Sequence, residues 1–273
     1  MYSGTTLTRA SGRIMGAHQK IDRLARGSLA VLLKSQAKFP GARKILHFEG
    51  YHGPDAIKRK SPAKDEPWHY YTPFDDTDTE LLTLISNHYD QLVAALRGQD
   101  EVRTAFEAAW LAHAIVDGLT PAHHFPYEEK LAELRGGAGL ETRDSLKGKM
   151  IMPGDTKREQ LRNNWRMWGP KGLLTTHGVF EWGIAILIKP FGQKQIALRT
   201  DDIAELHEYG LLELFRRKAK EISALGMYDQ YQKMGWTPAL VRQARRSLVP
   251  TIVHVVTLAW YAACIDAGLV KGK

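Results

Sequence analysis

The stretch that decides the fold covers residues 110–124 and reads WLAHAIVDGLTPAHH. On a helix formed by its apolar residues, His113 and Asp117 lie four positions apart, on one face and one turn from each other. Pro121 ends that helix, and His123 brings a further imidazole back to the same region. Because buried polar groups without partners are costly, His113 and Asp117 need either a metal ion or a hydrogen bond with each other.

The helical pattern continues on both sides of this stretch. Apolar residues at helical spacing and the local start and stop signals predict helices over residues 14–34, 79–98, 101–119, 128–134, 172–188, 200–225, 237–248 and 251–268. Nowhere does the sequence alternate in the way that is typical of a strand. We therefore expect an all-α protein, a multi-helix bundle in one domain over residues 1–273, with an irregular tail at 1–12.

Two segments lack a clean helical pattern. Residues 44–78 are rich in Pro, Gly, Asp, His and aromatic side chains, and the aromatics argue against disorder. A loop of that length in a compact domain is usually functional, so we expect an ordered loop that supplies side chains to a site. Residues 140–165 are polar and charged, and we expect them to form a mobile surface connection.

Composition limits the class of protein and of site. A hydrophobic content of 44% and a charged content of 25% are ordinary for a soluble globular protein. The net charge of +8 favours anionic partners such as phosphate esters, nucleic acid or an acidic membrane surface, or is a basic surface without a function. Cys264 is the only cysteine, which excludes an intrachain disulfide and any cysteine-based zinc site. Any metal must therefore be held by histidines and carboxylates, which suits zinc.

Targeting signals and membrane spans are not evident. The first 16 residues contain basic residues but no apolar core, so we expect no secretory signal and a cytoplasmic protein. Residues 179–188 are too short to span a membrane. Residues 249–270 are long enough but contain Pro250, His254 and Asp266, so we interpret them as a buried terminal helix and expect no transmembrane segment.

Histidines followed four residues later by an acid are more frequent than eleven histidines and 30 acidic residues in 273 positions would give by chance. The pairs are His18–Asp22, His113–Asp117, His124–Glu128 and His177–Glu181. Each is either a metal-ligand pair or a hydrogen-bonded helix pair. Simpler roles also exist for other candidates: His18 as a satisfied core histidine, His69 as a capping or stacking residue, and Asp55 as a turn residue after Gly-Pro.

Taken together, these residues resemble the signature of the zinc-dependent phospholipase C and P1/S1 nuclease superfamily, all-helical enzymes with a trinuclear zinc site. The core of that signature is His-x3-Asp-x5-His with Pro two residues before the last His, and residues 113–123 match it. The family also has a histidine in the first helix, an aspartate followed 14 residues later by a histidine among aromatics, and a helical His-x3-Glu. The matching residues are His18, Asp55, His69, His177 and Glu181.

The resemblance implies two to three zinc ions. The implied ligands are Asp55, His69, His113 and Asp117 for one ion, His123, His177 and Glu181 for a second with open positions for water and substrate, and His18 with a bridging Asp117 for a third. In the family, the amine and carbonyl of an N-terminal Trp complete the third site. Here residue 1 is Met, so the third ion would be absent, bound more weakly, or completed by the unprocessed backbone, His47 or Glu49.

By this resemblance the protein is a zinc-dependent phosphoesterase that hydrolyses a phosphodiester or phosphomonoester with metal-activated water, and Asp55 orients or deprotonates that water. The substrate would be an anionic phosphate ester, either a phospholipid headgroup or nucleic acid. The aromatic loop would recognise it, or would only pack on the core. The alternatives are a non-catalytic helical protein with a partial structural metal site and a basic nucleic-acid-binding module, for which the sequence has no recognition motif.

Overall fold

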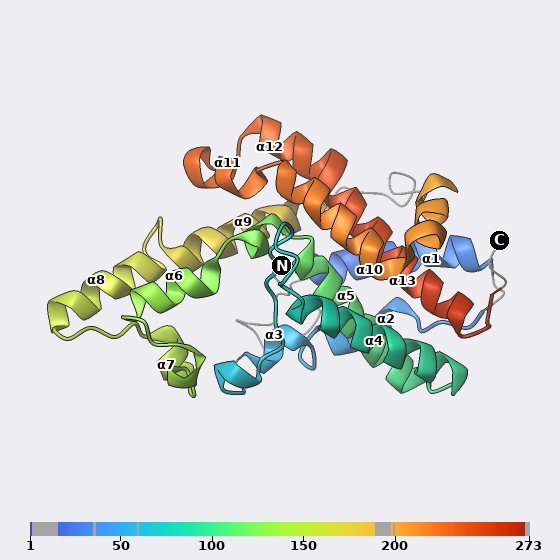
Figure 1. Cartoon of the computed structure of the whole chain (residues 1–273), viewed down its shortest axis with the longest axis horizontal. Coiled ribbons are helices and arrows are strands. Elements are labelled where there is room, and N and C mark those ends of the chain that lie inside the picture. The colour runs from blue at the N-terminus through green and yellow to red at the C-terminus, as the bar shows by residue number, and fades with distance from the viewer. Residues whose placement is uncertain (2–15, 35–36, 59, 189–197, 199, 271–273) are drawn as a thin grey trace.

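The computed structural model describes residue 1 and residues 16–34, 37–58, 60–188, 198 and 200–270 (Figure 1). All regular structure in these residues is helical, which confirms the all-α prediction. In chain order the α-helices are α1 (Ala17–Leu33), α2 (Ala42–Glu49), α3 (Pro54–Ile57), α4 (Glu80–Arg97), α5 (Glu101–Gly118), α6 (Tyr127–Leu134), α7 (Leu146–Met150), α8 (Lys157–Trp168), α9 (Leu173–Ile188), α10 (Thr200–Ala224), α11 (Met227–Met234), α12 (Pro238–Gln243) and α13 (Val249–Asp266).

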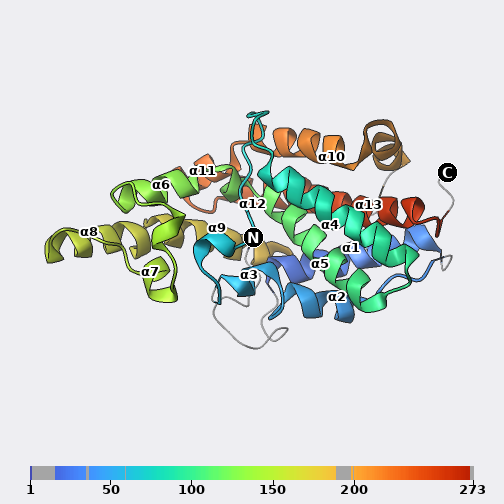
Figure 2. The same ribbon diagram turned by 60° about the horizontal axis from the view of Figure 1, so that its bottom comes forward.

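Helix α5 lies at the centre of the main bundle. It packs against α4 on one side and α2 on another, and α13 packs against α1, α4, α5 and α10 (Figures 1 and 2). Most residues of α5 are buried, as expected for a helix whose faces are all covered. Trp260 of α13 is fully buried, and its indole N–H donates to the carbonyl oxygen of Ala108 in α5 at 3.0 Å. The polar residues of α5 are thus held inside the core.

The end of α5 approaches its neighbours closely at Gly118. A Cβ added there would lie 2.5 Å from Cζ of the buried Phe215 and 2.6 Å from Cδ2 of Leu81. We expect Gly118→Ala to lower the free energy of unfolding by about 1–3 kcal/mol, because overpacking costs more than alanine's helix propensity restores. Urea unfolding measures this difference.

Gly178, inside α9, is the matched control, because a Cβ added there meets nothing within 4 Å. Gly178→Ala is expected to stabilise the fold by about 0.5–1 kcal/mol, the helix-propensity gain of alanine over glycine. Equal stabilisation by both substitutions would show that α5 does not approach Phe215 and Leu81 so closely.

Helices α6, α7 and α8 form an arm that extends away from the bundle and joins it through α9 (Figures 1 and 2). We call residues 127–168 the arm. It has a small apolar core of its own that includes Tyr127, Met152 and Met167. The side chain of Asn164 in α8 accepts from the backbone N–H of Met152 at 3.1 Å and donates to its carbonyl oxygen at 3.0 Å, so α8 is fixed to the segment that follows α7.

The structure corrects the prediction for residues 140–165, which form α7 and α8 rather than a mobile connection. Ser145 and Thr156 cap these two helices, since each hydroxyl accepts a hydrogen bond from a backbone N–H three residues ahead. The packing of Met167 and Asn164 then holds α8 in place. The high charge of this segment masked the helix in the sequence, because only one narrow side of α8 is buried and apolar positions are few.

The structure also corrects the prediction of a long loop over residues 44–78. This segment begins within α2 and contains α3 and a short 3-10 helix. Two turns of helix between Gly41 and Gly50 bury only Ile45 and Glu49, too few apolar positions for a clear period. Residues 66–78 have no α-helix, as predicted. Helix α11 was not predicted, and the predicted helix at 200–225 is interrupted at Gly210, where φ is 74°.

The remaining helix predictions agree with the structure to within a few residues, while residues 14–15 and 2–12 lie outside the described part of the chain. Within that part, the continuous helical stretch Pro238–Asp266 is long and apolar enough to cross a membrane, but most of it is buried inside the protein. The prediction of a buried terminal helix is therefore confirmed.

Candidate metal centre

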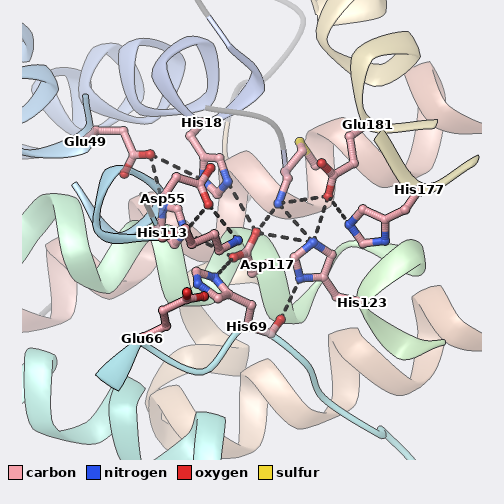
Figure 3. A network of polar contacts seen from close by, with 12 residues as sticks. His18, Glu49, Asp55, Glu66, His69, His113, Asp117, His123, His177 and Glu181 are labelled. Carbon is pink, nitrogen blue, oxygen red and sulfur yellow. Dashed lines mark hydrogen bonds and ion pairs between the residues drawn. The ribbon is translucent and has the colours of Figure 1, made fainter. Parts of the chain in front are cut away.

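All eight predicted ligand residues meet in one buried cluster where the bundle joins α9 (Figure 3). They come from α1, α3, the loop before α4, α5, the 3-10 turn Pro121–His124 and α9. Three sets of side chains each bring one ligand atom per residue to within 4.8 Å of the others. The sets are His18, His113 and Asp117; Asp55, His69 and His113; and His123, His177 and Glu181.

Local structure explains why the central residues point together. His113 and Asp117 lie on successive turns of α5, with Nε2 of the histidine 3.1 Å from Oδ2 of the aspartate. After α5 the chain turns at Pro121, so that His123 faces the same space. Two hydrogen bonds join this turn to the preceding loop: Tyr71 N–H donates to the His123 carbonyl at 3.1 Å, and His123 Nδ1 donates to the His69 carbonyl at 2.6 Å.

Two of the four predicted helix pairs form. His177 Nε2 lies 2.9 Å from Glu181 Oε1, and the pair His113–Asp117 is described above. The other two do not form, because Glu128 pairs with Arg143 and both carboxylate oxygens of Asp22 lack a hydrogen-bond partner among the described residues. Burial and the nearby Glu49 raise the pKa of Asp22, which favours its neutral form.

The histidine at 123 presents a lone pair to carboxylates. Because its Nδ1 donates to a carbonyl oxygen, Nε2 of the neutral ring is an acceptor. Yet Nε2 lies 2.8 Å from Glu181 Oε1 and 3.7 Å from Asp117 Oδ1, two further acceptors. Burial outweighs the nearby carboxylates and lowers the pKa of His123, so protonation does not readily resolve this conflict. The amino group of Met1, 3.2 Å from Nε2, is the cation that lies between the three groups, and a metal ion in its place would serve equally.

His113 is held in the orientation that metal-binding histidines usually have. Its Nδ1 donates to Glu49 Oε1 at 3.0 Å, while the buried Nε2 makes no counted hydrogen bond within the described residues and lies 3.1 Å from Asp117 Oδ2. A carboxylate behind the imidazole fixes the tautomer and makes the ring a better ligand. Burial opposes the charged ring, but Glu49 and Asp117 outweigh it and raise the pKa of His113 to about 10.

Other imidazoles in the cluster also have nitrogens without a hydrogen bond. Both ring nitrogens of His18 lack one to any described residue, although its Nε2 lies 3.3 Å from Asp117 Oδ1. Nε2 of His69 and Nδ1 of His177 also lack one. The His18 ring stacks on His113 with centroids 4.0 Å apart. Buried polar atoms without partners are rare in folded proteins. The donor set therefore fits bound metal ions better than a network of hydrogen bonds.

Two cations of the chain itself lie against these carboxylates. The amino group of Met1 contacts Asp117 and lies 3.3 Å from Glu181 Oε1. Nζ of Lys58 lies 2.9 Å from Asp55 Oδ1. Burial lowers the pKa of the Lys58 ammonium, but Asp55 outweighs this and raises it.

Glu49 and Lys58 have positions that the sequence did not predict. Glu49, expected as a possible ligand, lies behind His113 and accepts a hydrogen bond from it. His47, the other residue considered for the third site, is exposed, with its ring centroid 4.6 Å from that of His52. Lys58 was missed. The available signal was the spacing Asp55-x2-Lys58, which places the two side chains one helical turn apart.

The aromatic loop is divided between the site and the core. Tyr70 lies 5.4 Å from the His123 ring and stacks on Tyr127 of the arm at 5.5 Å. Tyr71 instead packs against Phe215 in the core, and Phe74 is exposed. The expected packing on the core is thus confirmed for Tyr71, while Tyr70 lies beside the cluster.

The charge balance of the cluster favours cations. Asp55, Asp117 and Glu181 are buried, yet the surrounding imidazoles and the cations of Met1 and Lys58 outweigh burial and lower the pKa of all three carboxyls. Three ionised carboxylates and histidines with free lone pairs are the ligands that zinc and similar divalent ions prefer.

No model of a known protein family, no curated protein and no solved structure matches this chain.

Proposed function

We propose that this protein is a metal-dependent phosphoesterase of the phospholipase C and P1 nuclease type, with zinc as its metal. The observation that supports this most strongly is that Asp117, a member of one ligand set, also lies within 4 Å of a histidine of each of the other two (Figure 3). Asp117 Oδ2 lies 2.6 Å from Nδ1 of His69, and its Oδ1 lies 3.3 Å from Nε2 of His18. A carboxylate that serves two ions would connect the sets into one multinuclear site.

The eight residues of the cluster would hold the ions, in the three sets that the distances between their ligand atoms define. Divalent ions bound there would supply activation of water and neutralisation of charge on phosphoryl oxygens. Asp55 would orient a water molecule or accept its proton. Lys58, whose ammonium lies beside Asp55 and whose side chain is 33% exposed, would bind a phosphoryl oxygen of the substrate from the solvent side.

The substrate would reach the centre beside α9. His177 and Glu181 are the most exposed of the ligands, each with 9% of the side chain accessible, whereas His18 and Asp117 have 1%. Tyr70 lies next to this set and offers a ring face to a headgroup or a base. Substrates of both kinds, a phospholipid headgroup and nucleic acid, are compatible with these residues.

Elemental analysis after dialysis, together with hydrolysis of bis(p-nitrophenyl) phosphate and p-nitrophenyl phosphate, tests the proposal. We expect two or more zinc ions per chain and hydrolysis that chelation abolishes. His177→Gln should lose about one ion and most of the hydrolysis, because it removes one ligand of a set of three. His88→Gln is the matched control, since the half-buried His88 pairs with the buried carboxylate of Glu107 outside the cluster at 2.6 Å.

Absence of bound metal, together with a melting temperature that chelation leaves unchanged, would overturn the proposal. A second candidate is a structural metal site without catalysis, and the burial of every ligand favours it. Two or more bound ions without hydrolysis of either ester would support that second function. Release of a phosphorylated headgroup would assign the enzyme to the phospholipase branch, and 3′-nucleotidase activity to the nuclease branch.

A further inference from the structure

Helix α8 presents an apolar row to solvent at the far end of the arm. Leu161, Trp165 and Trp168 follow one another at positions i, i+4 and i+7 and therefore share a face. They are 73%, 67% and 38% exposed. Met167 is buried on another side of the helix, and Asn164 bonds the Met152 backbone, so this orientation is fixed by the packing of the arm.

A basic row runs alongside the apolar row. Arg158, Arg162 and Arg166 are spaced four residues apart, are all exposed, and lie next to the apolar face on the helix surface. Glu159 is the only acidic residue of α8, and it lies 3.3 Å from the Arg162 guanidinium. The helix therefore combines an apolar face with an adjacent cationic one.

Nothing in the described part of the chain covers this face. Thr156, Arg158, Glu159, Leu161, Arg162 and Trp165, all from α8 and its cap, form one continuous stretch of this surface. Further exposed apolar side chains lie at and after α7, namely Leu146, Met150 and Ile151. The indole N–H of Trp168 donates to the Met150 carbonyl at 2.8 Å, so the two groups adjoin.

We propose that this face of α8 docks the protein on a bilayer that contains anionic phospholipid. Tryptophan and leucine on one face and arginines beside them are typical of helices that lie in the membrane interface. Because the arginines complement a negative surface, each would add to binding on anionic lipid. Trp165 and Trp168 can stack on bases as well as lie in a membrane interface, but Leu161, Met150 and Ile151 have no stacking surface, so the face as a whole fits lipid better than nucleic acid.

The proposal does not depend on the metal centre. It concerns the exposed end of the arm, whereas the ligands lie where α9 meets the bundle (Figure 1). The two are connected, since α8 packs against α9, which carries His177 and Glu181. A docked arm would therefore bring the phosphoesterase centre near a lipid surface.

Flotation with vesicles of phosphatidylcholine alone, or of phosphatidylcholine mixed with phosphatidylserine, tests this docking. We expect the full chain to bind the mixed vesicles and to bind the neutral ones at least about tenfold more weakly, with binding that falls as salt rises. The double variant Leu161→Ser/Trp165→Ser should lose at least about tenfold in binding to the mixed vesicles. The triple variant Arg158→Gln/Arg162→Gln/Arg166→Gln should lose most of the preference for anionic lipid.

Val31→Ser/Val102→Ser is the matched control, because these two exposed valines lie on the bundle and not on the arm. It should bind vesicles as the unmodified chain does, and far-UV circular dichroism should show that every variant is folded. Equal binding by the control and by the Leu161/Trp165 variant would overturn the proposal. So would binding of single-stranded DNA through the same residues without binding of vesicles. Vesicle binding that persists in His177→Gln would separate the docking from the proposed hydrolysis.

Discussion

Replacing Asp117 with Asn is expected to remove more than one metal ion per chain and to lower phosphodiester hydrolysis by roughly 10³-fold or more. The reason is its position: this carboxylate contacts His18, His69 and His113 and the amino group of Met1. Asn keeps the volume and one carbonyl oxygen but loses the charge that would balance two cations. Elemental analysis and initial rates at saturating zinc measure the two effects separately.

Glu107→Gln is the matched control on the same helix. Glu107 is fully buried on α5 and pairs with His88 and Arg103, away from the cluster. Its replacement should lower stability, because it breaks a buried pair, but it should leave the metal content unchanged. A full complement of metal in Asp117→Asn would show that this carboxylate does not bridge two ions.

The central part of the site could be predicted because its geometry is local. The helix period alone places His113 beside Asp117 and His177 beside Glu181, and both pairs form in the structure. Whether the two pairs come together depends on how α9 packs on the bundle, which no local rule supplies. There the family resemblance carried the prediction, and the structure brings the same eight residues together.

Residues that act through distant partners were missed or assigned another role. Glu49 lies 64 positions from His113 in the sequence, so its hydrogen bond to that ring becomes visible only once α2 is packed against α5. Lys58 is a different case, because its partner Asp55 is only three residues away and their spacing was visible in the sequence. What the sequence did not show for either residue is that it lies against the buried cluster, since the polar partner of a buried residue leaves no period in the sequence.

The arm shows the opposite limitation. Its residues are charged enough to suggest a mobile connection, yet two caps and one buried side of α8 suffice to order it. Such a helix gains most of its stability from tertiary packing rather than from propensity. Its unburied side, which makes the sequence look disordered, is the surface that we propose for membrane docking.

The metal-free protein is expected to lose stability as the pH rises from 6.5 towards about 10. The pKa of His113 is raised from 6.5 to about 10 in the folded state, where Glu49 and Asp117 outweigh burial. A raised pKa contributes stability that is fully present below 6.5 and is lost as the pH rises through the folded value. The loss should be a few kcal/mol, on the order of what such a shift corresponds to.

On the acid side the sign is reversed. Burial lowers the pKa of His69 to about 3 and that of His124 to about 4, so the unfolded chain binds protons that the folded chain does not. Their contribution is present above 6.5 and is lost as the pH falls towards these values. The stability of the metal-free protein should therefore have its maximum near pH 6.5, with losses on both sides.

Zinc should remove the loss of stability above pH 6.5, which we call the alkaline limb. The reason is that a ligand imidazole binds the ion in its deprotonated form and has no proton left to lose. Urea unfolding with and without zinc, at pH 6.5 and at about pH 9, measures this. His113→Gln is the decisive variant: without metal it should be less stable at pH 6.5 and should lose clearly less stability as the pH rises. A smaller loss above pH 8 should remain from the Met1 amino group, whose pKa Asp117 and Glu181 raise against burial. An equally steep alkaline limb in His113→Gln would mean that another group causes it, and that Glu49 does not hold a charged His113 in the metal-free fold.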